Sequence, residues 1–315
     1  MVLPSCLLGI QPTKLHGTDY VPLAAIAAEL GMERSWIEAE KEVRLQSQWT
    51  RMDFRLHKRF FELNGLPVYV GDPITFWRGD LYIAEKDYEQ SLKPILLPQA
   101  FPDRPKLFRI VLDPGHGGHD SGAVNPSLKL REEALALDLA LRIKPKLEAL
   151  GYQVLMTRST DTFVKLSDRP AFANKNNADL FISIHFNAGP ASVRGIETYA
   201  ITNPWQPSTG RDSLHSSDKR TYSGNKLGPR GALFGYYVQR AMTEKTGAPD
   251  RGLKRARFDV LRNLEAPGVL IEGGFLSNAT EGRNVGSSAY REKLAEAVVD
   301  AVLTYQRTLN RIRGR

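Results

Sequence analysis

The sequence has 315 residues, 42% of them hydrophobic and 25% charged, and a formal net charge of +8. This composition is that of a globular protein, and the length allows one large domain or two ordinary ones. It contains no run of about 18 apolar residues, which excludes a membrane-spanning helix, and its single cysteine, Cys6, excludes an internal disulfide framework. The positive charge favours an anionic partner such as nucleic acid, a membrane surface or an acidic polymer, although a solvated basic surface explains it equally well.

Residues 1–16 form an N-terminal segment without a complete signal peptide, because no basic residue precedes its short apolar stretch over residues 2–10. Within that stretch, the sequence LPSC at residues 3–6 resembles the end of a lipoprotein signal whose upstream part is absent. The sequence therefore favours an unmodified Cys6.

Residues 17–93 are predicted to form a small α+β domain. A helical pattern over residues 24–30 ends at Gly31, a residue that commonly terminates helices. Asn64-Gly65 is a pair typical of tight hairpin turns. Alternating apolar and polar residues on either side predict short strands over residues 43–46, 53–56, 60–63, 66–70 and 79–83.

This stretch is similar to the stalk domain found at the N-terminus of copper amine oxidases and of several bacterial cell-surface enzymes. The similarity is carried by YVPL…A…LG from residue 20, by the hairpin, and by LYIAEKDYE from residue 81. It implies a non-catalytic spacer or a wall-binding module. A domain that only packs against its neighbour is an equally good interpretation.

A proline-rich segment over residues 94–105 follows. Four of its twelve residues are proline, at positions 94, 98, 102 and 105. Because proline-rich segments adopt extended and semi-rigid conformations, we predict a stiff, extended linker that marks the domain boundary.

Residues 106–310 alternate strands with helices, which predicts an α/β domain of three layers, with a central mixed, mostly parallel sheet flanked by helices. The strands are predicted over residues 107–112, 153–157, 179–185, 195–201 and 269–272. The helices are predicted over residues 132–150, with a kink at Pro145, and over residues 167–175, 232–245 and 287–309. A polar loop is expected over residues 202–230, and a basic, frayed tail over residues 311–315.

Two histidines follow buried strands of this domain. The apolar strand that begins near Arg109 stops at Asp-Pro-Gly over residues 113–115, where proline and glycine force a turn, and His116 comes next. The strand over residues 179–185 ends in His185. Because α/β folds place their chemistry at the carboxyl ends of neighbouring strands, two histidines in these positions suggest a shared ligand.

A metal is the favoured shared ligand of the two histidines, because an acidic residue begins the helix that lies between them in the sequence. Two neutral imidazoles and one carboxylate, with a fourth position open for water, are typical of catalytic zinc. The lone Cys6 cannot make a thiolate site. On spacing alone either Glu132 or Glu133 can be the carboxylate, and the other is then a first-turn acid that favours the helix dipole.

Glu272 ends another apolar strand and is followed by two glycines. A buried carboxylate is unfavourable unless it is paired or used. At the rim of a zinc site it can take a proton from water and pass it to a leaving nitrogen. Zinc lowers the pKa of its water to about 7 and polarises the scissile carbonyl.

The segment from about residue 108 to 306 resembles the zinc-dependent N-acetylmuramoyl-L-alanine amidases of the amidase_3 type. The matching stretches follow the family's order and include IVLDPGHGGHDSGAV, EEALALDLALRI, LFISIHFNAG, RGIETYAI and RGLKRARFDVLRNLEAPGVLIEGGFLSN. The resemblance implies that His116, Glu132 and His185 bind one zinc ion. It also implies that Glu272 is the catalytic acid–base.

The choice of Glu132 over Glu133 rests on register within this resemblance. The family's glutamate stands five residues before a leucine and eight before an alanine, as Glu132 stands before Leu137 and Ala140. Asn187, close to the second histidine, is a candidate substrate-binding residue. A turn residue after a strand is an equally good interpretation of it.

The resemblance further implies a peptidoglycan hydrolase of the cell envelope, periplasmic or extracellular, that cleaves the amide bond between N-acetylmuramic acid and L-alanine. Anionic wall polymers are possible partners that would explain the charge, and nucleic acid is not expected because no nucleic-acid-binding motif is present. A non-catalytic wall-binding or regulatory protein of the same fold, or a zinc peptidase acting on other peptides, are the alternatives. The sequence does not indicate a protein activator.

The loop over residues 202–230 is long enough to be a lid. In some relatives an insert at this place forms a helix that blocks the zinc. Only Asp212, His215 and Asp218 are obvious plug residues, and no apolar period is present that would dock a helix firmly. We expect a mobile rim that shapes glycan access, in preference to a self-inhibiting plug.

Overall fold

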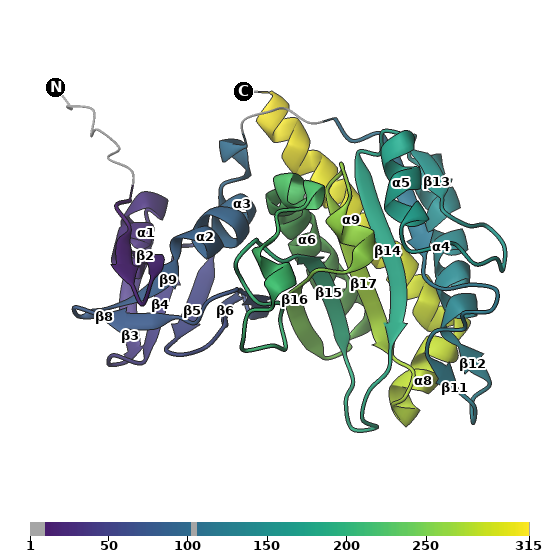
Figure 1. The fold of residues 1–315 in the computed structure, drawn as a ribbon, viewed down its shortest axis with the longest axis horizontal. Coiled ribbons are helices and arrows are strands. Elements are labelled where there is room, and N and C mark those ends of the chain that lie inside the picture. Colours follow the sequence, from purple (N-terminus) through teal and green to yellow (C-terminus); the bar gives the residue numbers. More distant parts are fainter. Residues whose placement is uncertain (1–9, 102–105, 315) are drawn as a thin grey trace.

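The computed structural model describes residues 10–101 and 106–314 (Figure 1). Cys6 with its lipoprotein-like surroundings, and two prolines of the predicted linker, Pro102 and Pro105, lie outside these residues. None of the helices in the described ranges is long and apolar enough to cross a membrane.

One sheet of eleven strands extends across the described residues, in the order β13-β10-β14-β17-β15-β16-β7-β6-β5-β4-β3. The first six in this order are β13 (Gln153–Met156), β10 (Arg109–Pro114), β14 (Leu180–Asn187), β17 (Gly268–Phe275), β15 (Ile196–Ile201) and β16 (Asp250–Ala256). Neighbours among them are parallel except β15, which runs antiparallel to β17. The predicted mixed, mostly parallel sheet is confirmed.

Helices cover both faces of this part of the sheet, which gives three layers (Figure 1). One face carries α4 (Glu132–Ala149), α6 (Gly228–Thr246) and α9 (Ser288–Arg313), and the other carries α5 (Asp168–Lys175) and α7 (Asp259–Arg262). Strand β10 shows why both faces are apolar. Ile110 and Leu112 are buried with the first group of helices and Val111 with the second, because successive side chains of a strand point to opposite faces.

Smaller elements complete this region. They are the two-stranded sheet of β11 (Val124–Asn125) and β12 (Leu130–Arg131), the 3₁₀ turns η3 (Ser216–Lys219) and η4 (Ser223–Leu227), and α8 (Ala279–Gly286). The expected fraying of the C-terminal tail is wrong for residues 311–313, which continue α9. Ile312 is buried in the main core, and this burial stabilises the last turn of the helix.

The N-terminal region is the small α+β unit that the sequence predicts. Five antiparallel strands complete the large sheet: β3 (Glu33–Glu38), β4 (Glu42–Gln46), β5 (Arg51–Arg55), β6 (Phe60–Leu63) and β7 (Leu66–Tyr69). A second sheet contains β1 (Thr13–Leu15), β2 (Thr18–Pro22), β9 (Asp80–Ala84) and β8 (Thr75–Trp77), and α1 (Leu23–Leu30) follows β2. The predicted hairpin turn joins β6 to β7, with φ values of 52° at Asn64 and 85° at Gly65.

The predicted extended linker is wrong for residues 94–100. After β9 the chain continues through α2 (Glu85–Asp87), the π-helical turn η1 (Tyr88–Leu92), α3 (Lys93–Leu96) and the 3₁₀ turn η2 (Pro98–Ala100). Pro94 stands in the first turn of α3, where its missing N–H needs no partner. Burial of Ile95 then favours the helix over an extended chain.

The two regions also share a sheet and a core. Strand β7 pairs in parallel with β16, with Val68 opposite Leu253. Leu253 and Tyr236, from the larger region, are buried in one hydrophobic cluster with Val68 and Phe54. The N-terminal unit is therefore packed against the larger one, while the exact residues of the domain boundaries stay predictions.

Candidate active site

His116 lies on the turn that follows β10. The backbone N–H of Gly115 donates to the carbonyl of Ile184 at 2.9 Å, which holds the turn beside the end of β14. His116 has a φ of 59°, a left-handed conformation that is uncommon for a residue with a Cβ and that concentrates at functional sites. Its Nδ1 lies 2.8 Å from a carboxylate oxygen of Asp120, and its Nε2 faces the start of α4.

Glu132, the first residue of α4, connects the two histidines. Its Oε1 lies 3.1 Å from Nε2 of His116 and 2.8 Å from Nδ1 of His185. The backbone N–H groups of Phe186 and Ala123 donate to its two oxygens at 3.1 and 2.7 Å. The ligand atoms of the three side chains lie within 4.8 Å of one another, and nothing else in the described ranges joins them. The structure thus brings the three predicted metal ligands together.

The charges of these side chains favour a cation between them. Burial alone raises the pKa of Glu132, but hydrogen bonds to His116 and His185 outweigh it and hold the pKa well below its usual range. Burial alone lowers the pKa of His116, but contacts with Glu132 and Asp120 outweigh it and raise the pKa. A carboxylate that faces two imidazoles stabilises positive charge, whether a proton or a metal ion supplies it.

Glu133, which spacing alone allowed as an alternative to Glu132, does not join the three metal-ligand side chains. Its Oε1 forms an ion pair with Nε of Arg131 at 2.8 Å. Its Oε2 is buried and has no hydrogen-bond partner in the described part of the chain. The geometry therefore agrees with the choice of Glu132.

Glu272 comes from β17, the strand that lies between β14 and β15. In register it stands opposite His185 on one side and Glu197 on the other. Its Oε2 is buried and finds no hydrogen-bond partner among residues 10–101 and 106–314. Burial, followed by the negative charges of Glu132 and Glu197, raises the pKa of Glu272 well above its ordinary value, although Lys254 opposes the effect.

Asn187, the candidate substrate-binding residue, is bonded within the protein. Its Nδ2 donates to Oε2 of Glu197 at 3.3 Å, and its Oδ1 accepts from the backbone N–H of Ala188 at 2.8 Å. A contact with substrate stays a prediction for this side chain.

A buried arginine that the sequence interpretation missed fixes the turn of His116. Arg169, only 2% exposed, donates through Nη1 to Asp113 and to the carbonyl of Pro114, each at 2.8 Å. Its Nη2 donates to the carbonyl of His116 at 3.0 Å. A signal was present, because Arg169 stands on the buried face of a short helix and Asp113 ends an apolar strand. Buried charges of this kind are kept only when they are paired.

A hollow of about 250 Å³ opens beside the two histidines. Its walls are His116, Asp120, Phe163, Val164, Leu166, Arg169, His185 and Val260. Phe163 and Leu166 belong to the loop before α5 and remain 41% and 54% exposed. The hollow therefore offers apolar surface next to the polar side chains of His116, Asp120, Arg169 and His185, a combination that is typical of substrate pockets.

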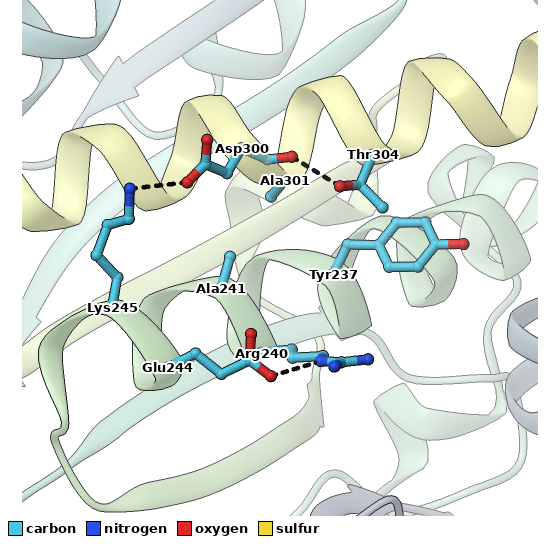
Figure 2. Close-up of a pocket in the computed structure, with 8 residues that line it drawn as sticks. All are labelled: Tyr237, Arg240, Ala241, Glu244, Lys245, Asp300, Ala301 and Thr304. Carbon is cyan, nitrogen blue, oxygen red and sulfur yellow. Dashed lines mark hydrogen bonds and ion pairs between the residues drawn. The ribbon is translucent and has the colours of Figure 1, made fainter. Parts of the chain in front are cut away.

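Another hollow, of about 480 Å³, lies between α6 and α9, and Figure 2 shows its walls. Its charged side chains pair with one another: Arg240 donates to Glu244 at 2.7 Å, and Lys245 lies 2.9 Å from Asp300. These charges are compensated within the two helices, and none of the side chains that line this hollow belongs to the candidate metal-ligand group of the described residues.

The loop over residues 202–230 is anchored through Asp218, and its predicted role as a mobile rim that shapes glycan access stays a prediction. Asp218 is fully buried and accepts hydrogen bonds from Arg211 at 2.9 Å and Arg257 at 2.7 Å. Asp212, a second candidate plug residue, is exposed and lies 3.8 Å from Arg59 of the N-terminal unit. No candidate plug residue joins the metal-ligand group of the described chain.

The chain belongs to the N-acetylmuramoyl-L-alanine amidase family, which it matches over residues 110–304. Residues 6–92 match the copper amine oxidase N-terminal domain. Both resemblances noted in the sequence are thereby confirmed.

Named relatives agree with this assignment. The chain is 33% identical to the N-acetylmuramoyl-L-alanine amidase LytC of Bacillus subtilis, over 63% of this chain and 35% of LytC. It is 32% identical to the amidase AmiC of Neisseria meningitidis, over 63% of this chain and 53% of AmiC. It thus spans only about a third to a half of these two relatives.

A solved structure, the catalytic domain of the amidase CwlV from Bacillus (Paenibacillus) polymyxa, superimposes with a TM-score of 0.53 at 29% identity. The superposition covers 64% of this chain and 99% of that domain. The similarity therefore extends over a complete catalytic domain of the family.

Proposed function

We propose that this protein hydrolyses the amide bond between N-acetylmuramic acid and L-alanine of the peptidoglycan stem peptide. The observation that carries the proposal is the convergence of His116, Glu132 and His185 within 4.8 Å, with Glu272 opposite His185 on the adjacent strand. Membership of the amidase family supports the same activity. The relatives LytC and AmiC are themselves named for it.

Zinc is the metal that this donor set fits best. Two imidazoles and a carboxylate are the ligands of several catalytic zinc sites, and we assign that role to His116, Glu132 and His185. A zinc ion held there would supply Lewis acidity at the scissile carbonyl and lower the pKa of water. Asp120 would support metal binding indirectly, because its hydrogen bond with Nδ1 of His116 fixes the orientation of the imidazole ring.

Glu272 is the group that we assign to proton transfer. It takes the proton of the attacking water and gives it to the leaving nitrogen of L-alanine, so that neither a hydroxide nor an amide anion has to be released. Its raised pKa suits this double role, because a carboxylate becomes a better proton acceptor as its pKa rises above the ordinary value. The buried Oε2, which has no hydrogen-bond partner in the part of the chain that the structure describes, is available for these contacts.

The cell envelope is the compartment that such a substrate requires. The net charge of +8 suits a partner that carries carboxylates or phosphates, such as peptidoglycan or an anionic wall polymer. We propose the periplasm or the cell exterior as the working location.

Digestion of purified peptidoglycan by the full chain, followed by mass analysis, tests the proposal. We expect stem peptides with a free L-alanine amino terminus and glycan strands stripped of peptide. The Glu272→Gln variant, matched in shape, should give neither. Cleavage inside the peptides would indicate a peptidase instead, and binding without products would indicate a non-catalytic wall protein.

A further inference from the structure

A second buried carboxylate, Glu197 of β15, stands opposite Glu272 on the side away from the metal ligands. It is 2% exposed and accepts hydrogen bonds from Nε of Arg251 and Nζ of Lys254, each at 2.5 Å. The hydroxyl of Tyr199 donates to it at 2.6 Å. Two cations therefore converge on one anion, one side chain away from the group that we assign to proton transfer.

Arg251 is only partly used by this network. Glu197 binds its Nε, and its guanidinium carbon lies 5.3 Å from the centre of the Phe275 ring. The side chain remains 35% exposed, and its two Nη atoms donate to no other described residue. A guanidinium that is held at Nε and stacked on an aromatic ring keeps a rigid fork of donors free, the geometry that binds carboxylates in a bidentate manner.

Positive charge remains in excess at this point. Lys254, 11% exposed, shares Glu197 with Arg251 and lies 5.8 Å from the ring centres of Tyr69 and Tyr199. Asp250, the acid nearest in sequence, accepts hydrogen bonds from Gln239 and from a backbone N–H, and no ion pair joins it to either cation within the described chain. Because Tyr69 lies on β7, the N-terminal unit forms part of the surroundings of this cluster.

We infer that Arg251 binds a carboxylate of the substrate on the peptide side of the cleaved amide. The inference rests on the proposed function, since stem peptides carry free carboxylates close to L-alanine. To donate its proton, Glu272 must face the leaving nitrogen of the peptide. Glu197 stands opposite Glu272 on the neighbouring strand and accepts a hydrogen bond from Arg251. The free fork of Arg251 therefore lies on the side where the released peptide begins.

The test compares two soluble muropeptides that differ at one group, the carboxylate of the second stem-peptide residue or its carboxamide. The wild-type full chain should prefer the carboxylate by about 10- to 100-fold in kcat/KM, the range expected for a charge-assisted hydrogen bond. Arg251→Gln should lose this preference mainly through a raised KM for the carboxylate substrate. Arg240→Gln is the matched control, because this arginine is likewise bound at Nε by a glutamate but lies in the hollow between α6 and α9.

The outcomes separate the inference from the proposed function. Failure of the wild type to cleave either muropeptide or peptidoglycan contradicts the function itself. Equal cleavage of the two muropeptides, or an unchanged preference in Arg251→Gln, overturns the inference alone. If Arg251→Gln does not fold because Glu197 keeps only Lys254 as a cationic partner, the double variant Arg251→Gln/Glu197→Gln removes the buried carboxylate charge as well. Loss of preference in the double variant supports the inference, and retention overturns it.

Discussion

Two buried carboxyl groups of the molecule, those of Asp87 and Glu272, differ in their hydrogen bonding. Where the N-terminal unit meets the larger region, Asp87 is 1% exposed and accepts from the backbone N–H groups of Gly71 and Asp72 and from Nε2 of Gln206. At the candidate active site, the buried Oε2 of Glu272 has no partner in the described chain. Both oxygens of Asp87 therefore accept hydrogen bonds, whereas Oε2 of Glu272 accepts none from the described residues.

This difference distinguishes a carboxylate that stabilises the fold from one that is available for chemistry. A buried polar atom without a partner is unfavourable by about 1–3 kcal/mol, so most such atoms are paired, and an exception needs an explanation. A cation near Asp87 is bonded less completely, since Nε of Arg255 has no hydrogen-bond partner among the described residues, although its Nη2 donates to Ser91 at 2.6 Å. We therefore expect changes at Glu272 to reduce activity and changes at Asp87 to reduce stability.

Removal of the metal should have the largest effect. We expect about one zinc per chain and complete loss of amidase activity after chelation, because the metal that the proposed ligands hold would supply the Lewis acidity at the scissile carbonyl. His116→Ala and His185→Ala should each lose zinc. Metal analysis of the purified variants, together with product release from peptidoglycan, checks this. Full activity in metal-free protein would contradict it.

The two adjacent acids of α4 provide a matched pair for the same prediction. Glu132→Gln should lose zinc, since its carboxylate faces both histidines. Glu133→Gln should retain zinc, because Glu133 pairs with Arg131 instead. The reverse pattern would move the ligand role to Glu133.

Glu272→Gln should have the next largest effect. The amide keeps the shape of the side chain but cannot accept and return a proton, so kcat should fall by about 10²- to 10⁴-fold, the usual contribution of general acid–base catalysis. Zinc content and melting temperature should stay near those of the wild type. Loss of zinc in this variant would instead identify Glu272 as a ligand.

Local patterns made most of the fold predictable from the sequence, and the missed strands have a physical reason. Strand β16 contains two arginines and a lysine among seven residues, so no apolar period indicated a strand. Its cations find polar partners only in three dimensions, where Arg251 and Lys254 share Glu197 and Arg255 donates a hydrogen bond to the hydroxyl of Ser91. The pairing of β16 with β7 was hidden for the same reason.

The site shows the same limit of sequence reasoning. His116, His185 and Glu272 were visible because each comes at or just after the end of an apolar strand, a local feature. Glu132 needed the register of a family motif, because Glu133 has the same chemistry one residue away. The long-range partner Arg169 was missed, because it contacts Asp113 across 56 positions of sequence.

Loss of Asp218 should affect stability more than activity. Removing this buried carboxylate leaves Arg257 and Arg211 without the anion that compensates their charge, so Asp218→Ala should lower the free energy of unfolding by about 3–5 kcal/mol. Urea unfolding measures the change. Exposed Asp212→Ala is the control and should change stability by less than about 0.5 kcal/mol. A large gain in peptidoglycan release after excision of residues 212–218 would instead support a plug.

The smallest effect should be the pH dependence of stability that Asp87 causes where the N-terminal unit meets the larger region. Burial, followed by the charge of Asp72, raises the pKa of Asp87 to about 6, against the bonds from Gly71 and Asp72 and the charge of Arg255. The pKa in the folded state is then above that in the unfolded state, about 3.9. Between these values the folded protein binds more protons, so this contribution to stability falls as pH rises from about 4 to 6 and stays low above.

The difference between wild type and Asp87→Asn isolates this titration, because groups common to both proteins cancel. The free energy of unfolding of the wild type, minus that of the variant, should fall by about 2–3 kcal/mol over that interval, the equivalent of the pKa difference. Asp72→Asn should reduce the fall, since it removes the neighbouring charge that helps to raise the pKa. A difference that rises with pH would mean that the bonds to Asp87 outweigh its burial, and that the junction holds this carboxylate ionised.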